Sequence, residues 1–414
     1  MAVKVKIMRR ILRNAAALAI AAAFLSPVSS YSQDNLVKAN DAYMDLRIDD
    51  AAKVLSTWET QLKKKRKAIP AELSEMRSKV TRAQNMLERV EKITIIDSIV
   101  VDKADFFTHY KLSPEAGKLF DASILPREYS EEAPIVVFKP QCRGEVFWGM
   151  LGEDGVTSIV SAQILDDGTF MQPTALGDVL NEGGDADYFY MMADGLTFYF
   201  ANNGENSLGG YDIFMSRRNG DGTVYQPQNV GFPYNSPYDD YMLVIDEQAG
   251  LGWWATDRNQ LPDQVTIYVF IPNDTRVNYD PEDENLEEYA KITSIAATQN
   301  GDVDVDRLLN NPALQAQTDN KLAAEDTFLF SLGNGKVYTT LSDFRNSQAR
   351  SMMRQYQDKL KDLDLMKGQL DALRRQYAKG DRTVKEQILT LEKRVNAAYP
   401  ALQRLRNQVI NLEK

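Results

Sequence analysis

One short stretch occurs twice in this chain, and the distance between the two copies defines a repeat. The copies read DGTFMQPTALGDVLN at 167–181 and DGTVYQPQNVGFPYN at 221–235, and they share seven identical residues. The offset that takes the first copy to the second also takes Ile159 to Ile213 and Ile213 to Ile267, in the stretches TSIVSAQ, YDIFMSR and VTIYVFI. All three stretches are rich in residues that favour strands. The chain therefore contains a repeated unit built from short strands and turns.

A period of about 50 residues with about four strands in each unit is typical of a β-propeller blade. One unit cannot bury both faces of its sheet, so units must stack on one another. The stretch DGLTFYFANNGENSLGGYDIFMSRR at 194–218 resembles the TolB-type propeller repeat of bacterial envelope proteins. The resemblance lies in an Asp-Gly turn, a strand, a Gly-Gly loop and an Asp-Ile-Phe strand, in that order. It covers about 135–275 and implies a β-propeller-like centre of antiparallel sheets.

Residues 1–32 have the pattern of a secretory signal peptide. Five cations precede the apolar run AAALAIAAAFL at 15–25, and small residues precede a cleavage site before Gln33. The alternative is an uncleaved anchor, but the run is short for a bilayer span. Cleavage removes five positive charges, so the mature chain carries -11 - 5 = -16. We expect a periplasmic protein, either free or associated with the outer membrane, without a transmembrane span after cleavage. So acidic a chain is a poor partner for nucleic acid.

Residues 33–93 show apolar residues at helical spacing. Leu36, Ala39, Tyr43 and Leu46 form one stripe, and a second stripe begins after the short turn RIDD. The stretch KANDAYMDLRIDDAAKVLSTW resembles a tetratricopeptide repeat, which implies two antiparallel helices. The basic run KKKRK at 63–67 is either a surface for an acidic partner or a solvated helix end.

Residues 94–340 are predicted to hold the propeller-like domain, with the clearest repeats at 135–275. The repeats supply about three blades, whereas closed propellers have about four or more. Two further strand-like stretches flank them, ITIIDSIVV at 93–101 and a hairpin, DTFLFSLGNGKVYTT, at 326–340. Because free sheet edges promote aggregation, we predict that at least one of these stretches pairs with the repeat sheets.

Residues 341–414 are predicted to form a helical hairpin or coiled coil. From Val384 to Leu412, apolar residues recur in strict steps of four and three, as in heptads. Gly380 and Asp381 suit a helix end and a new N-cap, so the two helices should turn back on each other. The alternative is one continuous helix, and Pro400 is expected to kink or split the second helix. The heptads also allow self-association through these helices.

Four carboxylates and two tyrosines are the candidate contact or loop-capping residues. They recur at corresponding places of the repeat and are Asp185, Asp187, Tyr188, Asp239, Asp240 and Tyr241. Paired carboxylates suit glycoside hydrolysis, and oxygen ligands suit calcium. A catalytic pair needs two unequal environments, however, whereas a feature repeated in each unit is more simply a loop cap. We therefore predict no catalytic, metal or cofactor site.

The remaining residue types narrow the chemistry further. Cys142 and His109 are the only cysteine and the only histidine, which excludes zinc sites built from these residues. Tyr188, Tyr190, Trp253 and Trp254 either stack on sugars or fill the packing between sheets.

The layout of repeat helices followed by a TolB-type propeller is similar to a periplasmic component of the type IX secretion apparatus. That resemblance implies scaffolding at the envelope, linked to secretion or outer-membrane assembly. The family also carries a C-terminal peptidoglycan-binding domain of the OmpA type, where this chain has the predicted hairpin. The sequence thus favours an exported, non-enzymatic protein-interaction module with unknown envelope proteins as partners. The alternative is a propeller that binds or processes carbohydrate.

Overall fold

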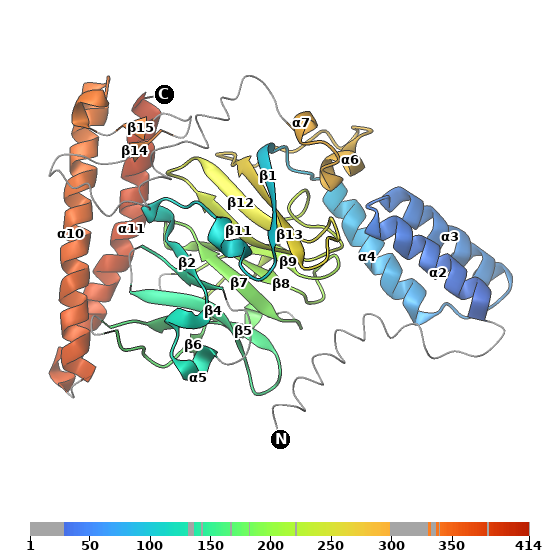
Figure 1. Cartoon of the computed structure of the whole chain (residues 1–414), viewed down its shortest axis with the longest axis horizontal. Coiled ribbons are helices and arrows are strands. Elements are labelled where there is room, and N and C mark those ends of the chain that lie inside the picture. The colour runs from blue at the N-terminus through green and yellow to red at the C-terminus, as the bar shows by residue number, and fades with distance from the viewer. Residues whose placement is uncertain are drawn as a thin grey trace. The chain divides into compact units, whose positions relative to one another are not determined.

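The computed structural model describes residues 29–130, 136–141, 144–165, 168–181, 183–219, 222–298, 330–332, 337–338, 340–378 and 381–413 (Figure 1). Helices and several antiparallel sheets make up the chain. It divides into two compact units, Met1–Gln84 and Asn85–Lys414, and each is described by itself. Cys142 and most of the signal-like segment lie outside the described residues.

The first unit is helical. It contains α2 (Ser29–Met44), α3 (Ile48–Lys64) and most of α4 (Ala71–Leu87). The buried face of α3 consists of Ile48, Ala51, Leu55, Trp58 and Leu62, as the apolar spacing predicts. Acidic residues in its first turn and lysines in its last turn complement the helix dipole. The first two residues of the run KKKRK belong to α3, which ends at Lys64. The Nζ of Lys63 lies 2.7 Å from Oε1 of Glu59.

Three antiparallel sheets form the centre of the second unit. Sheet I has the order β2 (Lys118–Phe120), β3 (Val137–Lys139), β4 (Glu145–Leu151), β5 (Thr157–Gln163) and β6 (Thr174–Ala175). Sheet II has the order β10 (Gln228–Asn229), β9 (Asp212–Arg217), β8 (Thr197–Asn202) and β7 (Ala186–Met191). Sheet III has the order β1 (Thr94–Asp102), β13 (Gln264–Ile271), β12 (Leu251–Thr256) and β11 (Asp240–Asp246). Within the residues described, the three sheets do not close into a ring.

The repeat of the sequence is a repeat of the structure. Ile159, Ile213 and Ile267 lie in β5, β9 and β13, which hold the same place in the three sheets. The short strands β6 and β10 follow them at the same offset. In the third copy that offset leads to Glu282 and Asp283, inside the acidic run, and such residues are poor strand formers.

In sheet III, strand β1 occupies the place that β6 and β10 hold in sheets I and II. It pairs antiparallel with β13, from Thr94 opposite Ile271 to Asp102 opposite Gln264. Figure 1 shows β1 beside β13. The prediction that a strand from outside the repeats joins their sheets is therefore confirmed.

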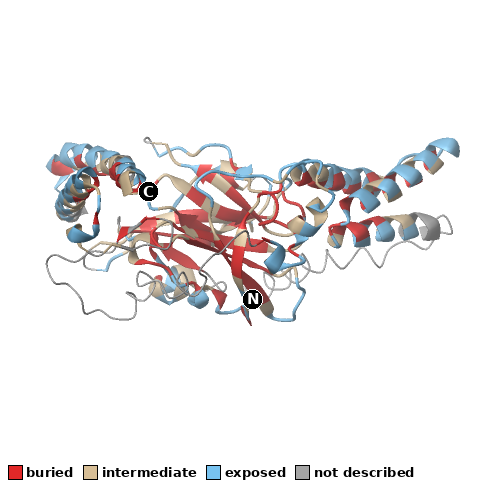
Figure 2. Cartoon of the chain, turned by 90° about the horizontal axis from the view of Figure 1, so that it is seen from above, coloured by how far each residue is buried: buried red, intermediate tan, exposed pale blue. Residues whose placement is uncertain are grey.

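Buried residues are concentrated on the strands of the three sheets (Figure 2). Large aromatic side chains join one sheet to the next. Phe147 of sheet I stacks on Phe189 of sheet II with 4.4 Å between the ring centroids. Tyr188 of sheet II stacks on Tyr241 of sheet III at 4.5 Å.

Two long helices end the described chain, α10 (Ser347–Ala378) and α11 (Lys385–Glu413). They bury Leu363 and Leu370 against Leu391 and other heptad residues, so they pack as a hairpin. Asp381 caps the turn before α11 by accepting the backbone N–H of Thr383, as predicted. Helix α11 runs unbroken past residue 400, which excludes a split there, one of the two effects predicted for Pro400, while the kink stays a prediction.

A two-stranded sheet, β14 (Phe330–Ser331) with β15 (Val337–Tyr338), supports the predicted hairpin near 326–340. In the part of the chain described, it pairs with none of sheets I to III. Its turn, and Gly380 between the helices, lie outside the described residues. None of the described helices combines the length and apolar character needed to cross a lipid bilayer.

Candidate functional site

Two of the candidate carboxylates make the same hydrogen bond in successive sheets. Asp185 Oδ1 accepts the backbone N–H of Thr157 at 2.8 Å. Asp239 Oδ1 accepts the backbone N–H of Tyr211 at 2.9 Å. Donor and acceptor are both shifted by one repeat, so each carboxylate ties the start of one sheet to the sheet before it.

A second hydrogen bond repeats at the same two loops. The backbone N–H of Asp185 donates to Asn203 Oδ1 at 2.7 Å, and that of Asp239 donates to Asp257 Oδ1 at 2.9 Å. Asn203 and Asp257 are separated by the same repeat offset. Both copies place a side-chain oxygen at this position, although one residue is an amide and the other an acid. The shared feature of the position is therefore a hydrogen-bond acceptor and not a charge.

Where the first copy has the amide of Asn203, the second has the carboxylate of Asp257, which lies close to Asp239. The lysine Lys103 compensates for the repulsion between these two acids. Burial raises the pKa of Asp257, Asp239 raises it further, and Lys103 lowers it. Lys103 Nζ lies 3.3 Å from Asp257 Oδ2 and 3.7 Å from Asp239 Oδ2. Lys103 follows β1, so this ion pair also fixes the added strand to sheet III.

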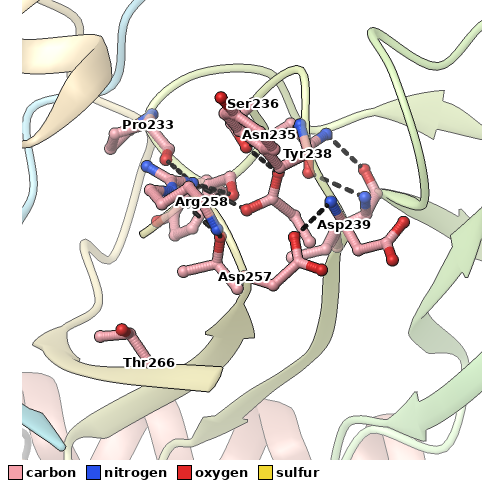
Figure 3. A network of polar contacts seen from close by, with 12 residues as sticks. Pro233, Asn235, Ser236, Tyr238, Asp239, Asp257, Arg258 and Thr266 are labelled. Atoms are coloured by element: carbon pink, nitrogen blue, oxygen red, sulfur yellow. Dashed lines mark hydrogen bonds and ion pairs between the residues drawn. The ribbon is translucent and has the colours of Figure 1, made fainter. Parts of the chain in front are cut away.

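Asp240 is fully buried, and its partners Ser236 and Arg258 are among the residues labelled in Figure 3. Arg258 Nη2 donates to Asp240 Oδ1 at 2.8 Å, and Ser236 Oγ donates to Asp240 Oδ2 at 2.6 Å. The same Nη2 also donates to the backbone oxygens of Pro233 and Tyr234. Burial raises the pKa of Asp240, while Arg258 opposes this by favouring the ionised form. The pair anchors the loop before β11.

Asp187 and Tyr188 lie at an irregularity of β7. Asp187 Oδ1 accepts the backbone N–H of Tyr188 at 2.7 Å, and Tyr188 has a φ of 56°. The pairing register shifts there, and it shifts again one repeat later in β11, around Met242, where φ is 55°. Such bulges redirect side chains. The Tyr188 ring thereby stacks on Tyr241, which is buried.

The four aromatic residues considered for sugar stacking contribute to the packing. Tyr190, Trp253 and Trp254 are buried, and the Tyr190 hydroxyl donates to the backbone oxygen of Ile245 at 2.7 Å. Tyr188 is half-buried against its tyrosine partner. The interpretation that these residues fill the interior is confirmed for the three buried ones.

Each of the candidate carboxylates has a structural partner within the fold. Asp185, Asp187 and Asp239 accept backbone N–H groups, and Asp240 faces an arginine. Over the described part of the chain, no three His, Cys, Asp or Glu side chains are arranged to hold a metal ion. His109 is exposed on a short 3₁₀ helix.

Sequence reasoning missed Lys103, Asn203, Asp257 and Arg258. The repeat offset could have found Asn203 and Asp257, since both fall at matching places of the repeat. Nothing local in the sequence marks Lys103 or Arg258. Comparisons with models of known protein families, with curated proteins and with solved structures find no match to this chain.

Proposed function

We propose that this chain is an exported, non-enzymatic protein-interaction or scaffolding module of the cell envelope. One observation carries the non-enzymatic part of the proposal. The acids that recur in the repeat are engaged in hydrogen bonds between or within sheets, as the pair Asp185 and Asp239 illustrates. A general acid or base must instead reach a substrate proton.

Within this proposal, the three sheets act as blades of an open, propeller-like core. Stacked sheets expose loops and edges over a wide surface, which suits contact with other proteins. Helical regions precede and follow the core, and helical hairpins commonly present rigid faces to partners. The resemblance to envelope proteins with TolB-type repeats supports a place in secretion or outer-membrane assembly.

The first experiment tests export. Protein recovered from the periplasmic fraction should begin at Gln33 when its N-terminus is sequenced. Cleavage there would remove the first four residues of α2, which begins at Ser29. Finding Met1 intact on exported material would remove the support for a periplasmic location.

The second experiment tests interaction. Mature protein immobilised on beads should retain specific envelope proteins from a detergent extract, and an unrelated acidic protein of similar charge serves as the control. A glycan array and a glycosidase screen test the carbohydrate alternative on the same preparation. Hydrolysis that is lost in a normally folded Asp187→Asn variant would place the protein among enzymes.

A further inference from the structure

Charge is distributed very unevenly along the chain. Residues 94–298 hold 34 acidic and 11 basic residues, a net charge of -23. Residues 341–414 hold 9 acidic and 16 basic residues, a net charge of +7. A basic helical hairpin therefore follows a strongly acidic sheet region. Asymmetry of this kind points to an electrostatic contact.

The outer faces of the hairpin combine cations with exposed leucines. On α10, Lys361 lies one turn before Leu365, whose exposed fraction is 67%. On α11, Leu389 lies one turn from both Lys385 and Lys393 and is 42% exposed. Helix α10 buries Leu363 and Leu370 on its other side. Figure 2 shows exposed residues along the outside of both helices.

The cations on these faces are available for a partner. Lys361, Lys385 and Lys393 are exposed, and none of them is paired with a carboxylate among the described side chains. An exposed apolar residue beside such cations adds apolar surface that a partner would remove from water, which favours binding.

The sheet region offers a segment of opposite charge. The run DPEDENLEE at 280–288 contains six carboxylates, and Asp280, Glu282, Glu284 and Glu288 are exposed. It begins where the third copy of the repeat departs from strand structure. A leucine and a tyrosine, Leu286 and Tyr289, lie beside these acids and are half-buried.

We propose that the basic outer faces of the hairpin bind the acidic segment 280–288 of a second copy of this chain. Copies would then associate head to tail, since the two contacting surfaces differ. This inference rests on the proposed function and names one partner for the interaction module.

Two other anionic partners fit the hairpin less well. Nucleic acid requires a stripe of cations, whereas nine acids are interspersed in residues 341–414. A membrane surface requires a wide apolar face on the helix, whereas among the described side chains each helix exposes one large apolar residue, Leu365 or Leu389.

Sedimentation velocity of the mature protein tests the proposal. The average mass should rise with protein concentration at low salt and return to that of a monomer near 1 M salt, where charges are screened within about 3 Å. A wild-type protein that stays monomeric at every concentration in low salt would overturn the proposal.

Charge reversal identifies the two surfaces. The hairpin variant Lys361→Glu/Lys393→Glu and the segment variant Glu282→Lys/Glu284→Lys should each weaken association roughly tenfold or more, because like charges then face each other. An equimolar mixture of the two variants should regain it, since each variant then meets an opposite charge. Association of either variant at wild-type strength, or no recovery in the mixture, would disprove the pairing.

Two controls keep the test specific. Lys111→Glu/Lys118→Glu reverses two exposed lysines outside the hairpin and should leave association unchanged. Circular dichroism spectra should show that all variants remain folded.

Sedimentation with phosphatidylglycerol vesicles in place of self-association would assign the hairpin to a membrane and refute the proposal. Capture of envelope proteins by a monomeric chain would leave the proposed function standing while this inference fails.

Discussion

Asp239 accepts the backbone N–H of Tyr211, and one repeat earlier Asp185 accepts that of Thr157. A sequence repeat is thus reproduced as a repeated hydrogen bond between sheets. The bond explains why aspartate occurs at this place in both copies.

Asp239→Ala should lower the free energy of unfolding by about 1–3 kcal/mol, because Tyr211 then lacks its acceptor. For a unit of this size, each kcal/mol shifts the melting temperature by about 1–2 °C. Asp239→Asn is the matched variant, since it keeps an oxygen at the same place and should lose less. Equal melting temperatures for Asp239→Ala and the wild type in thermal denaturation would contradict this role.

Gly210→Ala should destabilise the second unit, because an added Cβ would collide with the carboxylate of Asp239. Crowding of this kind costs about 1–3 kcal/mol. Gly368→Ala in α10 is the matched control, since no described atom beyond its chain neighbours and the backbone of its own helix turn lies within 4 Å of its added Cβ. It should raise stability by up to about 1 kcal/mol through helix propensity. Calorimetry that ranks the two variants in the opposite order would refute the close approach.

Tyr241→Phe should leave the stability unchanged or increase it. The Tyr241 hydroxyl is buried, and among the described residues it has no hydrogen-bond partner. An unsatisfied buried group costs about 1–3 kcal/mol, which the phenylalanine would recover. The ring would keep its stacking on Tyr188. A clear loss of stability in denaturant titration would show that the hydroxyl is bonded.

The stability of the fold should depend on pH because of the buried carboxyl group of Glu115. Burial raises the pKa of Glu115 from 4.5 to about 7, with a further rise from Asp246 that Arg406 opposes. Between these pH values the folded chain holds a proton that the unfolded chain releases, so the contribution of Glu115 to stability falls as the pH rises. The loss reaches at most about 3 kcal/mol above pH 7, at about 1.4 kcal/mol per pKa unit.

Glu115→Gln removes this titration. Its melting temperature should exceed that of the wild type at pH 8, and the difference should shrink towards pH 5. Parallel pH profiles for the two proteins would show that Glu115 ionises in the folded state as it does in solution.

A fragment spanning 130–278 should not fold cooperatively, because it lacks β1. The strand contributes Ile95, Ile96 and Val101 to the interior and covers the edge of β13. A fragment spanning 85–298 retains β1 and should melt in one transition. Cooperative unfolding of the shorter fragment with an equal midpoint would mean that sheet III is complete without β1.

Periodic features of the sequence were the predictable ones. Ile159, Ile213 and Ile267 located three strands because their spacing reflects equivalent places in three sheets. Heptads located α11, because one buried stripe suffices to pack it against a second helix. The addition of β1 was predictable from the cost of a free sheet edge.

Single long-range contacts were not predictable. Lys103 meets Asp257, and Arg258 meets Asp240, without any pattern in the neighbouring sequence. Such partners are selected by the folded geometry, and many side chains of the right charge would appear equally suitable beforehand. The positive φ of Tyr188 was equally unpredictable, because a bulge arises from the pairing of two strands and not from the sequence of either strand alone.

The pairing of β1 with β13 also fixes an order of events during folding. Thr94 emerges early in synthesis but meets Ile271 only after sheets I and II have been made. Contacts so distant along the chain form slowly. Until then the β-branched stretch ITIIDSIVV is an unpaired apolar strand, the kind of segment that aggregates. The growing chain therefore has a vulnerable interval, and a chaperone that covers residues 93–101 would act between the synthesis of the first strand and that of the last.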